Sequence, residues 1–182
     1  MEAYLPDYCY SKKTIKHEYI IIHFFSCLYV QPDDPFDTFS CQMLMHDLNV
    51  EPKYRMKFPM QEQPDRGWAS AHCMIARTGF TLLMVPRYNK AYHAGTSFYL
   101  GRSNFNEFSY GIEMIGHLTS GFEQKQYEAC ALECVSVMKE FNIPMSNILG
   151  HEQIAPGRKT DPGIANGNFH MDKLKELIGA LL

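Results

Sequence analysis

The short apolar run Tyr19–Phe25 is the feature of this chain that most restricts its fold. It is rich in β-branched and aromatic side chains and too short for a free-standing helix, so it predicts a buried β-strand. His23 interrupts the run near its end. The prediction therefore brings an imidazole to the end of a central strand, where a site could form.

Further strand patterns follow this run. His72–Arg77 and Phe80–Val85 are joined by a two-residue connection that ends in Gly79, which is typical of a tight antiparallel hairpin. Tyr110–Gly116, which is bracketed by glycines, predicts another strand, and a short strand is expected near 147–149.

Helical patterns lie between and after these strands. An apolar stripe over 36–48 predicts a helix, and the capping-box sequence Ser120–Glu123 predicts the start of a helix of roughly 18 residues. A terminal helix is expected to carry apolar residues on one face from Met171 to Leu181. The stretches 49–65 and 150–167 are expected to be loops. The buried face of the long helix is expected to comprise Tyr127, Ala131, Cys134, Val135, Met138 and Phe141.

These patterns together predict an α/β fold, with a mixed central β-sheet flanked by helices. The length of 182 residues is that of one domain, which we expect to span 1–182. The formal net charge is -3 and the basic residues are scattered, so the sequence indicates no basic patch that could bind nucleic acid. We therefore expect no nucleic-acid partner.

The sequence also bears on the compartment. The opening residues Met1–Asp7 lack the basic and apolar regions of a signal peptide, and the longest apolar run is interrupted by His23 and Ser26. The six cysteines follow no disulfide-framework spacing. We therefore expect a cytoplasmic protein that does not insert into a membrane, and we expect it to be a monomer.

Three of the eight histidines, His23, His93 and His151, lie in sequence contexts where a site could form. The segment Gly150–Gly163 also combines an imidazole, a lysine and a carboxylate within a turn-rich stretch. Zinc binds imidazole nitrogen and carboxylate oxygen, and a catalytic zinc needs three protein ligands. His23, His151 and Asp161 would supply such a set, whereas the alternative is a surface loop with ordinary salt bridges.

Several segments occur in an order that carries a resemblance. They are Ile21-Ile22-His23, Ser70–Ile75, Tyr92–Gly95, Gly101–Glu113 and Gly150–Gly163 with its Ala-Pro-Gly-Arg-Lys-Thr-Asp-Pro-Gly stretch. In this order the chain resembles the zinc-dependent N-acetylmuramoyl-L-alanine amidases of the AmpD and phage-lysozyme type, which are related in fold to peptidoglycan recognition proteins. The resemblance covers about residues 17–178.

The resemblance implies a role for each matched residue. His23, His151 and Asp161 are similar to the ligands of one zinc ion per chain. Lys159 matches the lysine beside the developing oxyanion, and Glu113 looks like the carboxylate that handles the proton of the zinc-bound water. Two neutral imidazoles and one carboxylate would leave the metal centre with a net positive charge, which suits this chemistry.

Four further residues lie on matched segments and are expected to bind substrate. His93 and His72 match family histidines that line the substrate, support the metal ligands or simply pack. Arg102 and Asn106 could bind a peptide carboxylate or backbone, although a solvated arginine is an equally good interpretation. Trp68 could stack on a sugar or cover the core.

The implied activity is hydrolysis of the amide between the lactyl group of N-acetylmuramic acid, with or without a 1,6-anhydro ring, and the L-alanine of the stem peptide. The acidic charge favours a soluble muropeptide substrate in cell-wall recycling. One alternative is a phage endolysin that cleaves intact murein. The other is a muropeptide-binding module without catalytic activity.

Overall fold

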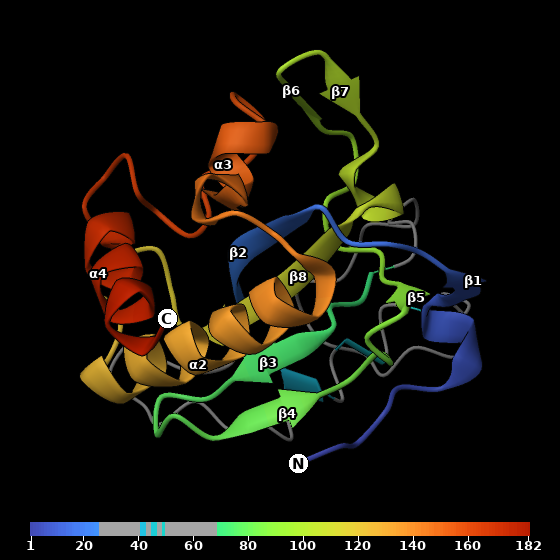
Figure 1. Ribbon diagram of the computed structural model, residues 1–182, viewed down its shortest axis with the longest axis horizontal. Helices are drawn as coiled ribbons and strands as arrows, with labels where there is room; N and C mark the ends of the chain where they lie inside the picture. Colours follow the sequence, from blue (N-terminus) through green and yellow to red (C-terminus); the bar gives the residue numbers. More distant parts are fainter. Residues whose placement is uncertain (26–40, 43–44, 47–48, 50–68) are drawn as a thin grey trace, which may run out of the picture.

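The computed structural model describes residues 1–25, 41–42, 45–46, 49 and 69–182 (Figure 1). The helix expected over 36–48 and the loop expected over 49–65 fall mainly outside the described residues, and Trp68 lies outside them as well. Among the described residues, no helix has both the length and the apolar character needed to cross a membrane.

A five-stranded mixed sheet forms the centre of the fold, in the order β4-β3-β8-β2-β9. Strand β4 runs antiparallel to β3, and the other neighbours are parallel. The sequence-predicted strands and hairpin are therefore confirmed. Their bounds are β2 (Tyr19–Phe25), β3 (Cys73–Ile75), β4 (Thr81–Leu83), β8 (Ser109–Ile115) and β9 (Ile148–Gly150).

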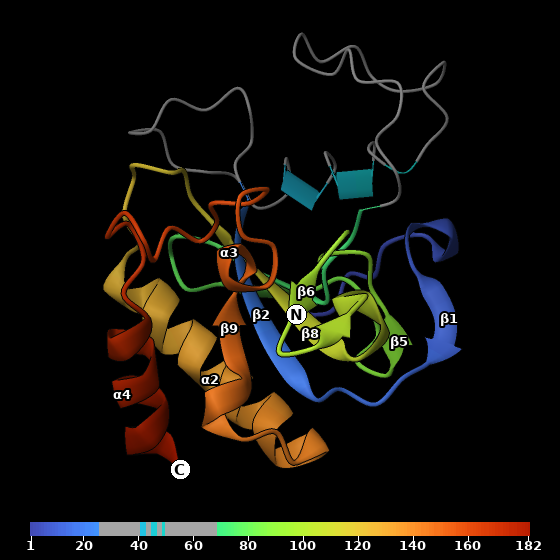
Figure 2. The same cartoon turned by 90° about the horizontal axis from the view of Figure 1, so that it is seen from above.

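Two small strand pairs lie outside this sheet. Strand β1 (Ser11–Thr14) pairs with β5 (Asn89–Lys90), and β6 (Phe98–Tyr99) pairs with β7 (Arg102–Ser103). The β6–β7 hairpin projects beside α3 (Figures 1 and 2). Single turns of 3-10 helix occur at Asp7–Cys9 (η1), Phe105–Glu107 (η3) and Met145–Asn147 (η4).

Helices α2 (Gln124–Phe141) and α4 (Met171–Leu181) lie side by side against the sheet (Figure 1). The 18 residues of α2 match the predicted length. The loop expected over 150–167 is partly wrong, because it contains the short helix α3 (His151–Ile154). All six apolar positions predicted for the inner face of α2 are buried: Tyr127, Ala131, Cys134, Val135, Met138 and Phe141.

The predicted capping box at Ser120–Glu123 is wrong by one turn. Glu123 is the N-cap residue itself, and its backbone N–H donates to Oε1 of Gln126 at 3.0 Å. The Ser120 hydroxyl instead accepts the N–H of His117 and closes the preceding turn. Both sequences fit a capping pattern, and the turn at Ser120 prevents the helix from beginning there.

Alternation along the strands separates a packing face from a site face. Ile20, Ile22 and Ile112 belong to the hydrophobic cluster that includes α2 and α4. Because successive strand residues point to opposite faces, His23 and Glu113 lie on the other face. They are also direct neighbours in the parallel register of β2 and β8. The pleat therefore supplies one apolar face for the core and one polar row for a site.

Gln126 links the start of α2 to the sheet. Its side chain is fully buried, and its Nε2 donates to the carbonyl oxygens of Ile75 (3.3 Å) and Ile115 (2.9 Å), at the ends of β3 and β8. A leucine at this position would leave those buried carbonyls without a donor.

We expect Gln126→Leu to lower the free energy of unfolding by about 1–3 kcal/mol, the usual cost of an unsatisfied buried polar group. Urea denaturation followed by circular dichroism measures the change. Gln124→Leu is the matched control, since Gln124 is exposed in the same turn of the helix. Equal stability of the two variants would show that Gln126 does not anchor α2.

Candidate metal centre

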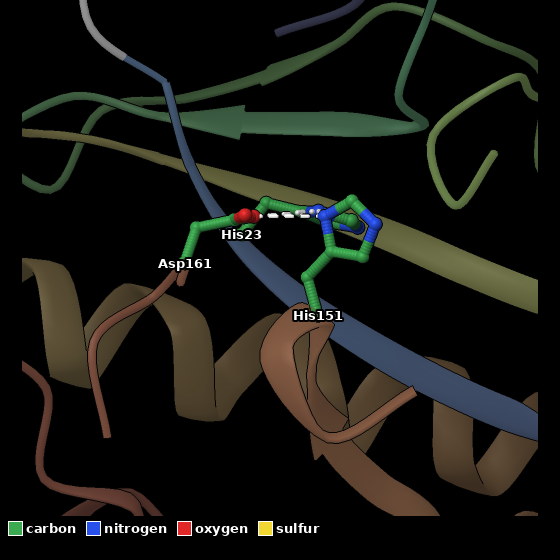
Figure 3. Close-up of side chains that lie close together, drawn as sticks. All are labelled: His23, His151 and Asp161. Atoms are coloured by element: carbon green, nitrogen blue, oxygen red, sulfur yellow. Dashed lines mark hydrogen bonds and ion pairs between the residues drawn. The ribbon is translucent and has the colours of Figure 1, made fainter. Parts of the chain in front are cut away.

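Three side chains from separate segments converge on the site face (Figure 3). Nδ1 of His23 lies 2.9 Å from Nδ1 of His151 and 3.1 Å from Oδ2 of Asp161. Nδ1 of His151 lies 2.9 Å from the same carboxylate oxygen. All three residues are buried, and their donor atoms form a compact triangle of two nitrogens and one oxygen that could hold a metal ion.

The sheet brings the two histidines together. His23 lies on β2, and the parallel partner of the preceding residue, Ile22, is Gly150 at the end of β9. His151 therefore follows β9 at the level of His23. Sites in sheets of this kind form beyond the carboxyl ends of parallel strands, where loops can add side chains.

Asp161 reaches the site because its loop packs closely on Gly150. A Cβ atom at Gly150 would lie 2.7 Å from Cδ1 of Ile164 and 2.8 Å from Cδ of Pro162. The backbone N–H of Glu152 donates to the carbonyl oxygen of Asp161 at 2.8 Å. A residue with a side chain at position 150 would push this loop, and Asp161 with it, away from the two histidines.

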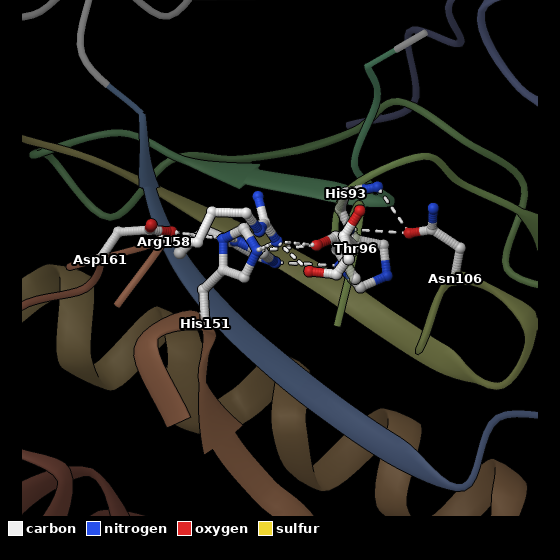
Figure 4. Close-up of polar contacts among 8 residues, drawn as sticks. His93, Thr96, Asn106, His151, Arg158 and Asp161 are labelled. Carbon is white, nitrogen blue, oxygen red and sulfur yellow. Dashed lines mark hydrogen bonds and ion pairs between the residues drawn. The ribbon is translucent and has the colours of Figure 1, made fainter. Parts of the chain in front are cut away.

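The outer nitrogens of both imidazoles are also engaged, and Figure 4 shows the surroundings of His151 and His93. Nε2 of His23 lies 2.9 Å from Nδ1 of His93, and Nε2 of His151 lies 3.0 Å from the carbonyl oxygen of Ala94. Two consecutive residues thus contact the two histidines from outside the triangle. Both Nδ1 atoms are left to face the position between the three side chains.

Burial and mutual contact set the charges of the triangle. Burial, together with the nearby His151, lowers the pKa of His23 to about 4. Burial alone would raise the pKa of Asp161, but hydrogen bonds with His151 and His23 hold it well below its usual range. At neutral pH His23 is therefore neutral and Asp161 is ionised, which are the forms that bind a metal.

Glu113 lies next to His23 in the sheet and is buried. Its Oε2 has no hydrogen-bond partner among the described residues. Burial first, and the charge of Asp161 second, raise its pKa to about 8, whereas Lys159 opposes the rise. A buried carboxyl oxygen without a partner is rare in proteins, and at the edge of a site it is available to a ligand or a water.

Lys159 is exposed two residues before Asp161 in the chain. Its charge lowers the pKa values of Glu113 and His23, so its ammonium group acts on the site. Its catalytic role stays a prediction.

The sequence predicts His72 at the substrate, whereas the structure places it in the interior. It is fully buried, and its ring stacks on Tyr110 with centroids 4.4 Å apart. Nδ1 accepts the N–H of Gly111 at 3.0 Å, and Nε2 donates to the carbonyl oxygen of Asn89 at 3.0 Å. Because backbone groups satisfy both nitrogens, its position is that of a structural residue.

Asn106 and Arg102 are also engaged within the protein. Oδ1 of Asn106 accepts the backbone N–H groups of His93 (3.0 Å) and Ala94 (2.7 Å). Arg102 donates to both carboxylate oxygens of Glu18, at 2.7 and 3.1 Å. The predicted substrate contacts of these two residues stay predictions, and the observed contacts are internal.

Arg158 has a role that its sequence context does not indicate. Its Nη2 donates to the carbonyl oxygens of Ala94 (2.7 Å) and Thr96 (2.6 Å), which ties the loop of Asp161 to the segment that contacts both histidines (Figure 4). Arg158 belongs to the motif that carries the resemblance. Nη2 also lies 3.3 Å from Nε2 of His151. The two backbone carbonyls, however, are not marked by any residue type in the sequence.

The raised pKa of Glu113 predicts a pH-dependent stability for the metal-free protein. Between about pH 4.5 and about 8 the carboxyl holds a proton in the folded protein and loses it on unfolding. Stability contributed by this group is therefore lost as the pH rises through that window. Relative to wild type, Glu113→Gln should gain stability steadily across the window, because glutamine cannot ionise.

Urea denaturation of chelator-treated protein at several pH values measures this difference. Glu176→Gln, which changes an exposed carboxylate on α4, is the control and should differ from wild type by a constant amount. A constant difference for Glu113→Gln as well would contradict the raised pKa.

Comparison with known proteins agrees with this geometry. Residues 13–164 match the N-acetylmuramoyl-L-alanine amidase family. The chain is 43% identical over 96 residues to the 1,6-anhydro-N-acetylmuramyl-L-alanine amidase AmpD of Enterobacter cloacae. That match covers 53% of this chain and 51% of the relative, so the chain spans about half the length of the curated relatives it matches.

Solved structures extend the likeness to nearly the whole chain. A crystal structure of AmpD superposes with a TM-score of 0.77 at 27% identity, over 97% of this chain and 93% of that one. The Escherichia coli amidase AmiD, solved with anhydro-N-acetylmuramic acid-L-Ala-D-γ-Glu-L-Lys, shares the fold, with a TM-score of 0.65 at 20% identity over 92% of this chain and 59% of that one. The family match and the shared fold together show that the chain belongs to the N-acetylmuramoyl-L-alanine amidase family.

Proposed function

We propose that the chain is a zinc-dependent N-acetylmuramoyl-L-alanine amidase. Its reaction is hydrolysis of the amide between the lactyl group of N-acetylmuramic acid and the L-alanine of the stem peptide. The observation that carries this proposal is the convergence of His23, His151 and Asp161 beside the unpartnered carboxyl of Glu113. Family membership supports the same reaction.

The donor set fits one zinc ion per chain. Two imidazole nitrogens and one carboxylate oxygen are ligands that zinc accepts, and three protein ligands are the usual number in a catalytic site. The outer nitrogens of His23 and His151 are already bound, so each ring can present Nδ1. When bound, zinc would polarise the scissile carbonyl and lower the pKa of a water molecule at the site.

The protein's own residues would handle the proton and the charge. The positive charge of a bound zinc would lower the raised pKa of Glu113, and the ionised carboxylate could then take a proton from the attacking water and return it to the leaving amine. Lys159 would place its ammonium group where the carbonyl oxygen gains negative charge. Asp161 stays ionised and cannot share the role of Glu113.

We further infer that the substrate is a 1,6-anhydro muropeptide in cytoplasmic cell-wall recycling. The name of the AmpD relative supports this substrate. The free, buried thiols of Cys9, Cys73, Cys130 and Cys134 fit a reducing compartment. The family match and the near-complete structural match support a single amidase domain over 1–182.

The first test separates the two carboxylates. Asp161→Ala should lose zinc, because it opens the ligand set. Glu113→Gln should retain zinc and lose about 10²- to 10⁴-fold in turnover, because it removes only the proton acceptor. Metal analysis of the purified variants and a muropeptide cleavage assay measure both effects. Loss of zinc from Glu113→Gln, or wild-type turnover in that variant, would refute the assigned role.

The second test concerns Lys159. Lys159→Ala should retain zinc and lose about 10²-fold or more in turnover, as expected when a preorganised positive group beside an oxyanion is removed. Lys139→Ala, an exposed lysine of α2, is the control and should turn over like wild type. Equal turnover of both variants would show that Lys159 has no catalytic role.

The third test identifies the substrate. Purified enzyme is given a soluble anhydro-muropeptide and, separately, intact murein, and release of the stem peptide is measured. Faster cleavage of the soluble compound is expected. Preference for intact murein would favour an endolysin, and binding without cleavage of either substrate would favour a non-catalytic module.

A further inference from the structure

We propose that His93 positions the metal ligand His23, by accepting a hydrogen bond from Nε2–H of His23 and so holding its Nδ1 toward the metal. The inference rests on the proposed zinc site and assigns the site a further residue. By its sequence context, His93 could line the substrate, support a metal ligand or simply pack. The contacts of its ring distinguish these roles.

The hydrogen bonds around His93 fit only one arrangement of protons once His23 binds metal through Nδ1. The proton of His23 must then lie on Nε2, which is 2.9 Å from Nδ1 of His93. His93 accepts there, so its own proton lies on Nε2, 3.2 Å from the carbonyl oxygen of Ser109. The Ser109 hydroxyl lies 3.3 Å from the same Nε2 but donates to the carbonyl oxygen of Phe105. Nε2 of His93 therefore faces only acceptors, which sets the direction of both hydrogen bonds.

The ring of His93 is itself held in place. A Cβ atom at Gly111 would lie 2.5 Å from Cγ and 2.7 Å from Nδ1 of His93. The ring therefore packs directly on the backbone of β8, where only glycine leaves room. Asn106 accepts the backbone N–H of His93 at 3.0 Å and fixes the start of its side chain.

The residue after His93, Ala94, contacts the second histidine ligand, His151, through its backbone. The carbonyl oxygen of Ala94 accepts from Nε2 of His151, and Arg158 donates to the same oxygen. Partners of this kind orient the ligands of metal sites, and their loss usually costs about 10- to 100-fold in metal affinity. His93 is the member of this segment that acts through its side chain, so it can be tested by substitution.

The test measures zinc affinity by competition with a chromophoric chelator, which needs no catalytic turnover. His93→Phe keeps a ring of similar size but removes the acceptor, and it should weaken zinc binding by about 10- to 100-fold. His93→Asn should recover much of the loss, because its Oδ1 can accept near the position of Nδ1. His17→Phe is the control: His17 is also buried but contacts His72, Tyr110 and Phe141 rather than a ligand.

A second variant tests the same role without removing His93. Gly111→Ala should displace the ring and weaken zinc binding, whereas adding Gly111→Ala to His93→Ala should have no further effect, because the clashing ring is gone. This non-additivity remains measurable even if His93→Phe does not fold. Additive losses in the double variant would overturn the proposal.

The remaining outcomes also decide the question. Wild-type zinc affinity in His93→Phe, or an equal loss in His17→Phe, would overturn the positioning role. A raised KM with unchanged zinc affinity would make His93 a substrate contact instead. Failure of the wild-type protein to bind zinc would refute both the proposed zinc site and this inference. The other outcomes overturn the role of His93 alone and leave the proposed function standing.

Discussion

The parallel register of β2 with β8 and β9 is the constraint on which the site depends. It sets His23 beside Glu113 and brings His151 to the same level at the end of β9. A shift of one residue in β2 would turn His23 toward the helices and an isoleucine toward the site. The apolar face packed against α2 therefore determines the register of β2, and the register determines which side chains reach the site.

Contacts outside the triangle orient the two histidine rings that the sheet brings together. The segment His93–Thr96 contacts both histidines of the triangle, and it is held from one side by Asn106 and from the other by Arg158. Nearly all of these contacts involve backbone groups. Buried polar atoms need hydrogen-bond partners. The buried side chains of this site are therefore stable only if the surrounding backbone supplies those partners. Glu113, the neighbour of His23 in the sheet, lacks such a partner at Oε2 among the described residues.

The sequence predicted the elements with strong periodicity and the residues with distinctive chemistry. The strand containing His23, the hairpin around Gly79 and the length of α2 are confirmed because burial determines each pattern. Residue chemistry offered His23, His151 and Asp161 as one possible ligand set, and the resemblance favoured it, since nothing in their spacing brings them together. Other features could not be predicted, because they depend on the positions of backbone groups, which residue types do not reveal. These are the capping site at Glu123, the hydrogen bonds of Asn106 and the role of Arg158.

The central claim is that Nδ1 of His23, Nδ1 of His151 and the carboxylate of Asp161 share one zinc ion. Anomalous scattering at the zinc edge, from crystals of the zinc-loaded protein, tests it directly. The account predicts a single strong peak within about 2.0–2.2 Å of all three groups, with Nε2 of His23 still bonded to His93. A peak bound through Nε2 of either histidine, or located away from these side chains, would contradict it.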